Sequence, residues 1–231
     1  MNSQRIQKIE DIPTFNKIED IHNILHTRGC RLCELGYQPN INGCCVSRGS
    51  FNTKKMIIGE APGKEEDARG TPFTGPAGVL MDQIWRSVGM DTNDWYITNV
   101  IHCRPIAPVG SGKQNLTPKH EQIGKCSIFI NEEIRLLNPK IIESMGAIAT
   151  AAMLGINTVK MGDHRGKAVS TAVSAGILRG AGMKQVTLFP MLHPAALLHA
   201  KGNIEKYNQY RREMWQDVQK LKEILTNLDL L

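Results

Sequence analysis

The stretch that decides the fold is Lys55–Gly63, which reads KMIIGEAPG. Its first five residues form a short apolar run of the kind found in strands buried on both faces of a parallel sheet. The residues that follow form a Gly- and Pro-containing turn with exposed backbone amides, which suits contact with a phosphate or a base edge. A buried strand that leads directly into such a turn is typical of α/β proteins, which bind ligands beyond the carboxyl ends of their strands.

Further apolar runs along the chain extend this pattern. Three of them have the length of buried strands: Trp95–Ile101, Lys140–Met145 and Gln185–Leu192. Stretches with apolar residues at helical spacing lie between the runs, and strands that alternate with helices form parallel sheets covered on both faces. We therefore predict an α/β fold, a three-layer α/β/α sandwich around a central, mostly parallel four-stranded sheet.

Helices and loops complete the expected arrangement. Residues 1–25 are predicted to form a polar lead-in and a helix, and residues 203–228 a long amphipathic C-terminal helix. Thr117-Pro118 is predicted to cap and begin a helix, whereas the Gly- and Pro-rich stretch Gly63–Gly78 is predicted to be a loop. Without an internal repeat, a chain of 231 residues suits a single domain over 1–231.

The composition narrows the class of protein. Hydrophobic residues make up 41% of the chain and the formal net charge is +6, which favours an anionic partner such as nucleic acid. No apolar run approaches the roughly 18 residues of a membrane span, and the polar N-terminal segment does not resemble a secretory signal. We therefore expect no membrane partner and a location in the cytoplasm, which is a reducing compartment. The protein is also expected to be a monomer.

Three unusual clusters follow predicted strands: Gly59–Gly63, Asn99 and His193-Pro194. The carboxyl ends of parallel strands meet at one edge of a sheet, so these clusters are expected to face one crevice. Taken singly, each has an ordinary structural explanation: Asn99 as the cap of a strand end, and His193 as a packed loop residue. Their convergence is the reason to expect an active site.

The cysteines form a second pattern. Cys30 and Cys33 are a compact C-x2-C pair, and Cys103 and Cys126 form a widely spaced pair that a fold can bring together. In a reducing compartment such cysteines favour metal or cluster binding over disulfides. Their number suits zinc and an iron–sulfur cubane equally. Cys44-Cys45 is interpreted as a surplus pair of structural thiols.

Five linked motifs resemble a known family. They are GEAPG at Gly59–Gly63 with Glu66-Asp67, GTPFTGPAG at Gly70–Gly78, ITNV at Ile97–Val100, CRP at Cys103–Pro105, and HPAAL at His193–Leu197. In this order and spacing, from about Cys30 to Leu198, they resemble the family-four (iron–sulfur) branch of the uracil-DNA glycosylase superfamily. The resemblance implies an enzyme that hydrolyses the N-glycosidic bond of uracil in single- or double-stranded DNA.

The resemblance also implies a role for individual residues. Those assigned to catalysis are Glu60, Glu66 and His193. Those assigned to binding the extruded uracil are Ala61, Gly63, Phe73 and Asn99, with Phe73 stacking on the base and Asn99 reading its Watson–Crick edge. Leu197 is assigned to the wedge that fills the vacated stack. Cys30, Cys33, Cys103 and Cys126 are assigned to a 4Fe-4S cluster, with zinc as the alternative.

One departure concerns water activation. The best-known uracil glycosylases carry an aspartate where Ala61 stands, so the resemblance shifts the water-handling role here to Glu60. Two other functions remain open from the sequence. One is a glycosylase-fold protein that binds DNA or a partner without turnover, and the other is an iron–sulfur electron carrier, which would leave the strand-end motifs without a purpose.

Overall fold

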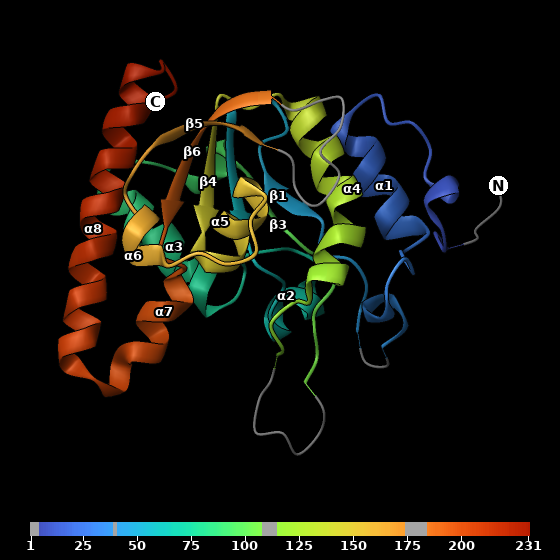
Figure 1. The fold of residues 1–231 in the computed structure, drawn as a ribbon, viewed down its shortest axis with the longest axis horizontal. Coiled ribbons are helices and arrows are strands. Elements are labelled where there is room, and N and C mark those ends of the chain that lie inside the picture. Colours follow the sequence, from blue (N-terminus) through green and yellow to red (C-terminus); the bar gives the residue numbers. More distant parts are fainter. Residues whose placement is uncertain (1–4, 39–40, 108–114, 174–183) are drawn as a thin grey trace.

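The computed structural model describes residues 5–38, 41–107, 115–173 and 184–231. Its centre is a six-stranded sheet with the strand order β1-β3-β2-β4-β6-β5 (Figure 1). The strands are β1 (Ser47–Gly49), β2 (Lys55–Gly59), β3 (Tyr96–Asn99), β4 (Ile141–Met145), β5 (Val169–Val173) and β6 (Lys184–Met191). Strands β3, β2, β4 and β6 run parallel, and the two edge strands pair antiparallel.

The predicted four-stranded sheet was wrong in strand number. All four predicted strands are present within two residues of their expected ends, but β1 and β5 were missed. β1 is only three residues of SRG, without an apolar run to mark it. β5 reads VSTAV inside a Gly-rich region and lies at an edge, where one flank needs no hydrophobic partner.

Helices cover both faces of the sheet, which confirms the three-layer α/β/α arrangement. The longer helices are α1 (Ile18–Thr27), α3 (Pro76–Ser87), α4 (His120–Leu137), α5 (Gly146–Leu154) and α8 (Ile204–Asn227). The short ones are α2 (Lys64–Arg69), α6 (Met161–His164), α7 (Pro194–His199) and the 3-10 turns η1 (Ile9–Asp11), η2 (Glu34–Tyr37), η3 (Thr92–Asp94) and η4 (Ala200–Gly202). None of the helices in the described ranges has the length and apolar character that crossing a bilayer requires.

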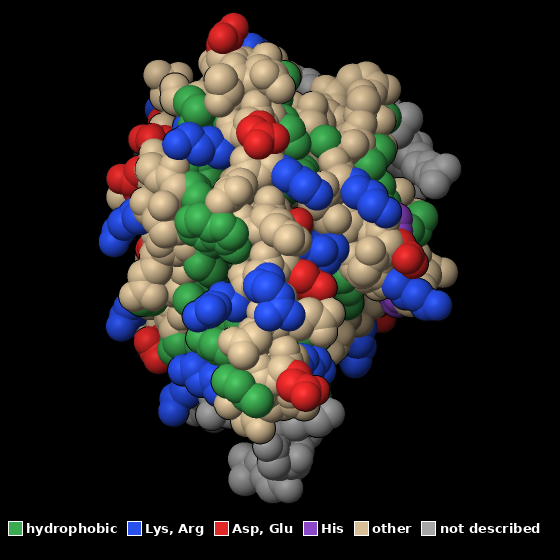
Figure 2. Space-filling view, turned by 90° about the vertical axis from the view of Figure 1, so that its left-hand side faces the viewer, with side chains coloured by type: hydrophobic (Ala, Val, Ile, Leu, Met, Phe, Trp, Pro, Cys, Tyr) green, Lys and Arg blue, Asp and Glu red, His purple; other side chains and the backbone are tan. Residues whose placement is uncertain are grey.

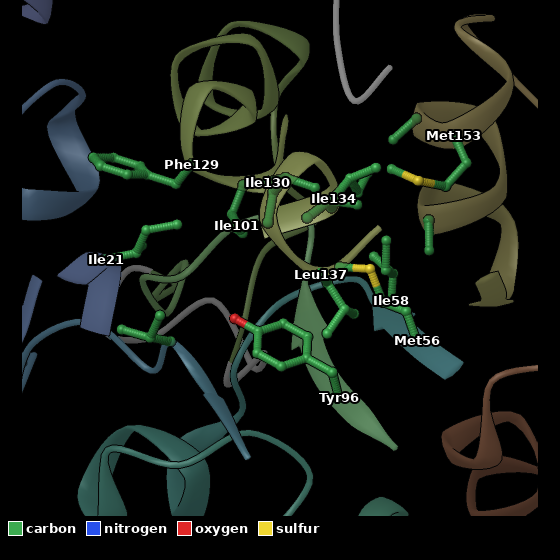
Figure 3. Close-up of a cluster of buried hydrophobic side chains, with 14 of the residues drawn as sticks. Ile21, Met56, Ile58, Tyr96, Ile101, Phe129, Ile130, Ile134, Leu137 and Met153 are labelled. Carbon is green, nitrogen blue, oxygen red and sulfur yellow. The ribbon is translucent and has the colours of Figure 1, made fainter. Parts of the chain in front are cut away.

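The alternation of side chains along each strand divides the core between the two helical layers. Met56 and Ile58 point to the α1, α4 and α5 side, where Ile130 and Ile134 of α4 pack over them (Figure 3). Ile57, between them in sequence, points to the α3 and α8 side. All three side chains are fully buried, which explains why this strand reads as a continuous apolar run.

Two expectations about helix positions need correction. The stretch 63–78 was expected to be a loop, yet it contains α2 and the start of α3. Three consecutive acids, Glu65, Glu66 and Asp67, favour the positive end of α2, and left-handed Gly70 ends it. The helix expected to begin at Thr117-Pro118 begins at His120, because Gln122 accepts a hydrogen bond from the Lys119 backbone and closes a capping box there.

Candidate active site and cysteine cavity

An open cavity of about 700 Å³ lies where the carboxyl ends of β2 and β3 meet the chain leaving β6. We call it the crevice. Its walls come from the Gly59–Gly63 turn, α2, the loop before α3, the first turn of α7, and the base of the loop after β3. Every residue assigned to uracil binding or catalysis, Glu60, Ala61, Gly63, Glu66, Phe73, Asn99 and His193, lines it. The predicted convergence of the strand-end clusters is therefore confirmed.

A glycine at the end of β2 allows two of these side chains to approach each other. Gly59 pairs with Asn99 in the parallel register of β2 and β3. A β-carbon at Gly59 would collide with the Asn99 amide oxygen and with the Phe73 ring. Both side chains are buried, Asn99 at 2% and Phe73 at 5% exposure. The strand therefore has to end in glycine to hold an amide and an aromatic ring against the same spot.

The backbone at Phe73 is itself unusual. Its φ is 54°, in the left-handed region that a bulky side chain seldom adopts. The following turn is held by Glu66, whose carboxylate oxygen accepts a hydrogen bond from the Gly75 amide at 2.8 Å. Such strain survives only where the surroundings fix it, and it is found most often at ligand sites.

His193 completes the crevice from the opposite wall. Its ring lies 5.7 Å from the Phe73 ring, centroid to centroid, with the planes 30° apart. Its Nδ1 accepts a hydrogen bond from the Ala195 amide at 3.1 Å and caps α7. Burial lowers the pKa of His193 from 6.5 to about 4, so the ring is neutral at pH 7. Because Nδ1 is the acceptor, the single proton lies on Nε2.

The two acids of the crevice differ in their surroundings. Burial raises the pKa of Glu60, which lies in the turn after β2. Glu66 instead bonds the Gly75 amide, and its carboxylate fills the space that a β-carbon at Gly63 or Gly75 would need. Glu66 therefore fixes the two glycine turns against each other, and Glu60 lines the same crevice.

Leu197 does not lie where the wedge role requires. It is only 3% exposed and packs with Leu192 and Met214 of α8 in a small core. The α7 helix turns the Leu197 side chain inward, so Leu197 borders a neighbouring groove but not the crevice. The next residue, Leu198, is partly exposed and lines both the crevice and this groove of about 450 Å³. Leu198 thus lies between the crevice and the neighbouring groove.

A second, smaller cavity holds the cysteines, and we call it the cysteine cavity. Five cysteines line it: Cys30, Cys33, Cys44, Cys103 and Cys126. They come from the segment after α1, from the residues before β1, from the loop after β3, and from α4. As predicted from the sequence, the fold brings the Cys30–Cys33 pair together with the distant cysteines Cys103 and Cys126. Its other walls are largely apolar, with Leu25, Leu35, Ile101 and Phe129 among them.

The donor set suits a thiolate-bound metal group. Burial raises the pKa of the Cys30 and Cys33 thiols, so bound iron or zinc is needed to favour their thiolates here. In the described part of the chain, no three His, Cys, Asp or Glu side chains gather closely enough to hold a single metal ion. A cubane carries its four thiolates on four separate irons. The four predicted ligands and Cys44 line this one cavity, so the cysteines present fit such a group.

Sequence reasoning missed several residues around the cysteine cavity. Cys44 had been set aside as structural, yet its sulfur lies 3.7 Å from that of Cys103. His102 is fully buried, with Nδ1 3.8 Å from the Cys126 sulfur and Nε2 3.2 Å from a Glu133 carboxylate oxygen. Glu133 is itself fully buried on α4. Two features of the sequence could have indicated these residues. Glu133 stands at an apolar position of its helix, and His102 directly precedes the predicted ligand Cys103.

The fold and the crevice together define an α/β protein whose strand-end crevice places an aromatic ring beside an amide and an imidazole. The family model of the uracil DNA glycosylase superfamily matches residues 46–219. The chain belongs to this superfamily.

Relatives in that superfamily resemble most of the chain. The chain is 32% identical over 197 residues to a type-4 uracil-DNA glycosylase of Thermotoga maritima, which covers 85% of this chain and 89% of that protein. It is 32% identical over 185 residues to a type-4 uracil-DNA glycosylase of Pyrobaculum aerophilum, which covers 78% and 84%. A third such enzyme, from Sulfurisphaera tokodaii, is 30% identical over 200 residues, with 84% and 80% covered.

Proposed function

We propose that this protein is a monofunctional uracil-DNA glycosylase of base excision repair, which hydrolyses the N-glycosidic bond of a uracil flipped out of DNA. The observation that carries the proposal is the meeting of Asn99, Phe73 and His193 in one crevice. The names of the type-4 relatives support the same activity. Water and the uracil nucleotide are consumed, and free uracil and an abasic site are produced.

Recognition follows from the two side chains held at Gly59. A base inside a duplex is out of reach, so it is extruded into the crevice, where the Phe73 ring offers a stacking face. The Asn99 amide donates to uracil O4 with its NH₂ group and accepts from N3–H with its oxygen. Cytosine presents the opposite donors and acceptors, so the same amide rejects it.

His193 acts on the bond that breaks. As the uracil leaves, negative charge develops on the base, and the Nε2–H of the neutral His193 ring donates a hydrogen bond to O2. The tautomer is already set by the Nδ1 bond to the Ala195 amide. A donor fixed before the reaction stabilises developing charge without reorganisation.

The two acids take different parts in the proposed mechanism. Glu60 orients the attacking water beside the sugar, because it lines the open crevice and the Glu66 carboxylate is already bonded to the Gly75 amide. Glu66 is a positioning residue that acts through Gly75 and the Phe73 loop.

Leu198 is the proposed wedge in place of Leu197. Its position between the crevice and the neighbouring groove lets it enter the gap that the flipped nucleotide leaves. Figure 2 shows Lys and Arg side chains interspersed with Asp, Glu and hydrophobic side chains over the face that α8 crosses. Lys201 and Lys206 are exposed beside α7, and Lys64 is exposed at the crevice rim. These charges attract the phosphate backbone.

Cys30, Cys33, Cys103 and Cys126 are the proposed ligands of a 4Fe-4S cluster. Such a cluster would supply iron–thiolate bonds that tie the segment after α1 to the loop after β3 and to α4. The free state of all six cysteines fits a reducing, cytoplasmic location. All the crevice residues come from a single chain, so a monomer is sufficient for the proposed activity.

The test is alkaline cleavage of DNA after incubation with the protein. Oligonucleotides that contain one uracil, in a single strand, a U·A pair or a U·G mismatch, should be cleaved at that position. The same oligonucleotides with thymine or cytosine should stay intact, and free uracil should appear in the supernatant. A protein that binds the uracil oligonucleotides but leaves them alkali-stable would instead be a glycosylase-fold binding protein.

A further inference from the structure

Cys44 is the cysteine of the cavity to which the proposed cluster gives no role. Its side chain is 5% exposed and lines the same cavity as the four proposed ligands. Its Sγ lies 3.7 Å from the Sγ of Cys103, and the backbone N–H of Cys30 is directed at it. Cys44 therefore belongs to the buried core and also lines the cysteine cavity.

The spacing of the two sulfurs is informative. Two thiolates bound to one tetrahedral metal at about 2.3 Å lie roughly 3.8 Å apart. The sulfurs of Cys44 and Cys103 lie at nearly this spacing. Thiolates on different irons of a cubane lie farther apart, so the sulfurs of Cys44 and Cys103, which are in direct contact, are close enough to reach one iron of the proposed cluster.

The neighbouring Cys45 shows that this position is specific. Consecutive side chains of an extended segment point in opposite directions. The Cys45 thiol donates to the carbonyl oxygen of Glu66 at 3.1 Å, and Cys45 is not among the five cysteines that line the cavity. The CC pair thus places one thiol in the cavity and one outside it, which makes Cys45 a matched control.

We propose that Cys44 is a reserve ligand, able to take the place of Cys103 on the cluster. In the exchange the Cys44 thiol gives up its proton and its sulfur binds iron. The Cys103 thiolate leaves that iron and takes up a proton, and no electron is transferred. The inference rests on the proposed cluster, and it adds a fifth cysteine to the four that the family resemblance assigns.

The experiment measures iron and acid-labile sulfide per chain, together with visible absorption, in protein prepared without oxygen. Cys103→Ala should keep about half or more of the wild-type iron, and Cys103→Ala/Cys44→Ala should lose it by roughly 10-fold or more. Cys30→Ala should lose iron as the double variant does, because the sulfur that the Cys44 sulfur contacts is that of Cys103. Cys45→Ala should match the wild type.

Equal iron loss in Cys103→Ala and in the double variant would overturn the inference. A wild-type protein without iron would overturn the proposed cluster itself, and the inference with it. A second measurement does not depend on the folding of Cys103 variants. Transfer of iron from the intact protein to a chelator should be several-fold faster in Cys44→Ala than in the wild type and Cys45→Ala, and equal rates would contradict a reserve ligand.

Discussion

The crevice and the cysteine cavity lie on either side of one short segment, residues 99–105, yet they are built differently. The crevice is open, and backbone features position its side chains: Gly59, the left-handed Phe73, and the cap made by His193. The cysteine cavity is enclosed by apolar side chains and thiols from four distant segments. Because of this difference, we expect substitutions in the crevice to change the reaction rate, and substitutions in the cysteine cavity to change the stability of the protein.

The largest expected effect is on the crevice side. His193→Ala should lower the rate of uracil excision by about 10²–10³-fold, the usual loss when one fixed donor to a developing charge is removed. Excision rates under single-turnover conditions measure it. His193→Asn is the matched control because asparagine keeps an acceptor for the α7 cap. It should retain the wild-type Tm and iron content and still be slow. A His193→Ala rate close to that of the wild type would take His193 out of the chemistry.

The corresponding change on the cavity side is Cys30→Ala. It should remove the cluster and lower the Tm by several degrees, because a group bound only in the folded state stabilises that state. Iron content and thermal unfolding measure both effects. An unchanged Tm in the iron-free variant would mean that the two regions do not divide reaction and stability as described.

Leu197 and Leu198, which are adjacent on α7, allow effects on stability and on reaction rate to be separated within a single helix. Leu197→Ala should lower the free energy of unfolding by about 2–5 kcal/mol, as a core truncation does, and should affect all substrates alike. Leu198→Ala should leave stability nearly unchanged. It should slow excision most for U·A, less for U·G and least for single-stranded DNA, since unstacking costs a few kcal/mol and least where the base is unpaired. If Leu197→Ala instead slowed excision in this substrate order and Leu198→Ala did not, Leu197 would be the wedge.

The smallest effect concerns pH. The pKa of His193 is about 4 in the folded protein and 6.5 as its ordinary value. Between these values the unfolded chain binds more protons at this residue, so its contribution to stability falls as the pH drops from about 6.5 to about 4. Thermal unfolding over this range should show a steeper pH dependence for the wild type than for His193→Asn. Equal slopes would mean that His193 titrates normally in the fold.

Much of the architecture could be predicted because buried parallel strands consist of continuous apolar residues. The strand Lys55–Gly59 was predicted with both of its ends correct. Edge strands carry no such signal. The burial of Leu197 could not be predicted from the motif, because each step along a helix turns the side chain by about 100°, which separates the buried Leu197 from the partly exposed Leu198. Cys44 could not be assigned from spacing alone, since its direction depends on how the segment before β1 packs. The single domain over 1–231 stays a prediction.

The central claim is that the crevice binds uracil and that Asn99 reads it. The most direct test compares excision of uracil and of cytosine by the wild type and by Asn99→Asp. A protonated aspartate presents the donors and acceptors that cytosine needs, and loss of one good base contact costs about 1–3 kcal/mol. We predict that the wild type releases only uracil, and that Asn99→Asp releases cytosine and is slower on uracil. An Asn99→Asp variant with wild-type rate and selectivity would contradict the account.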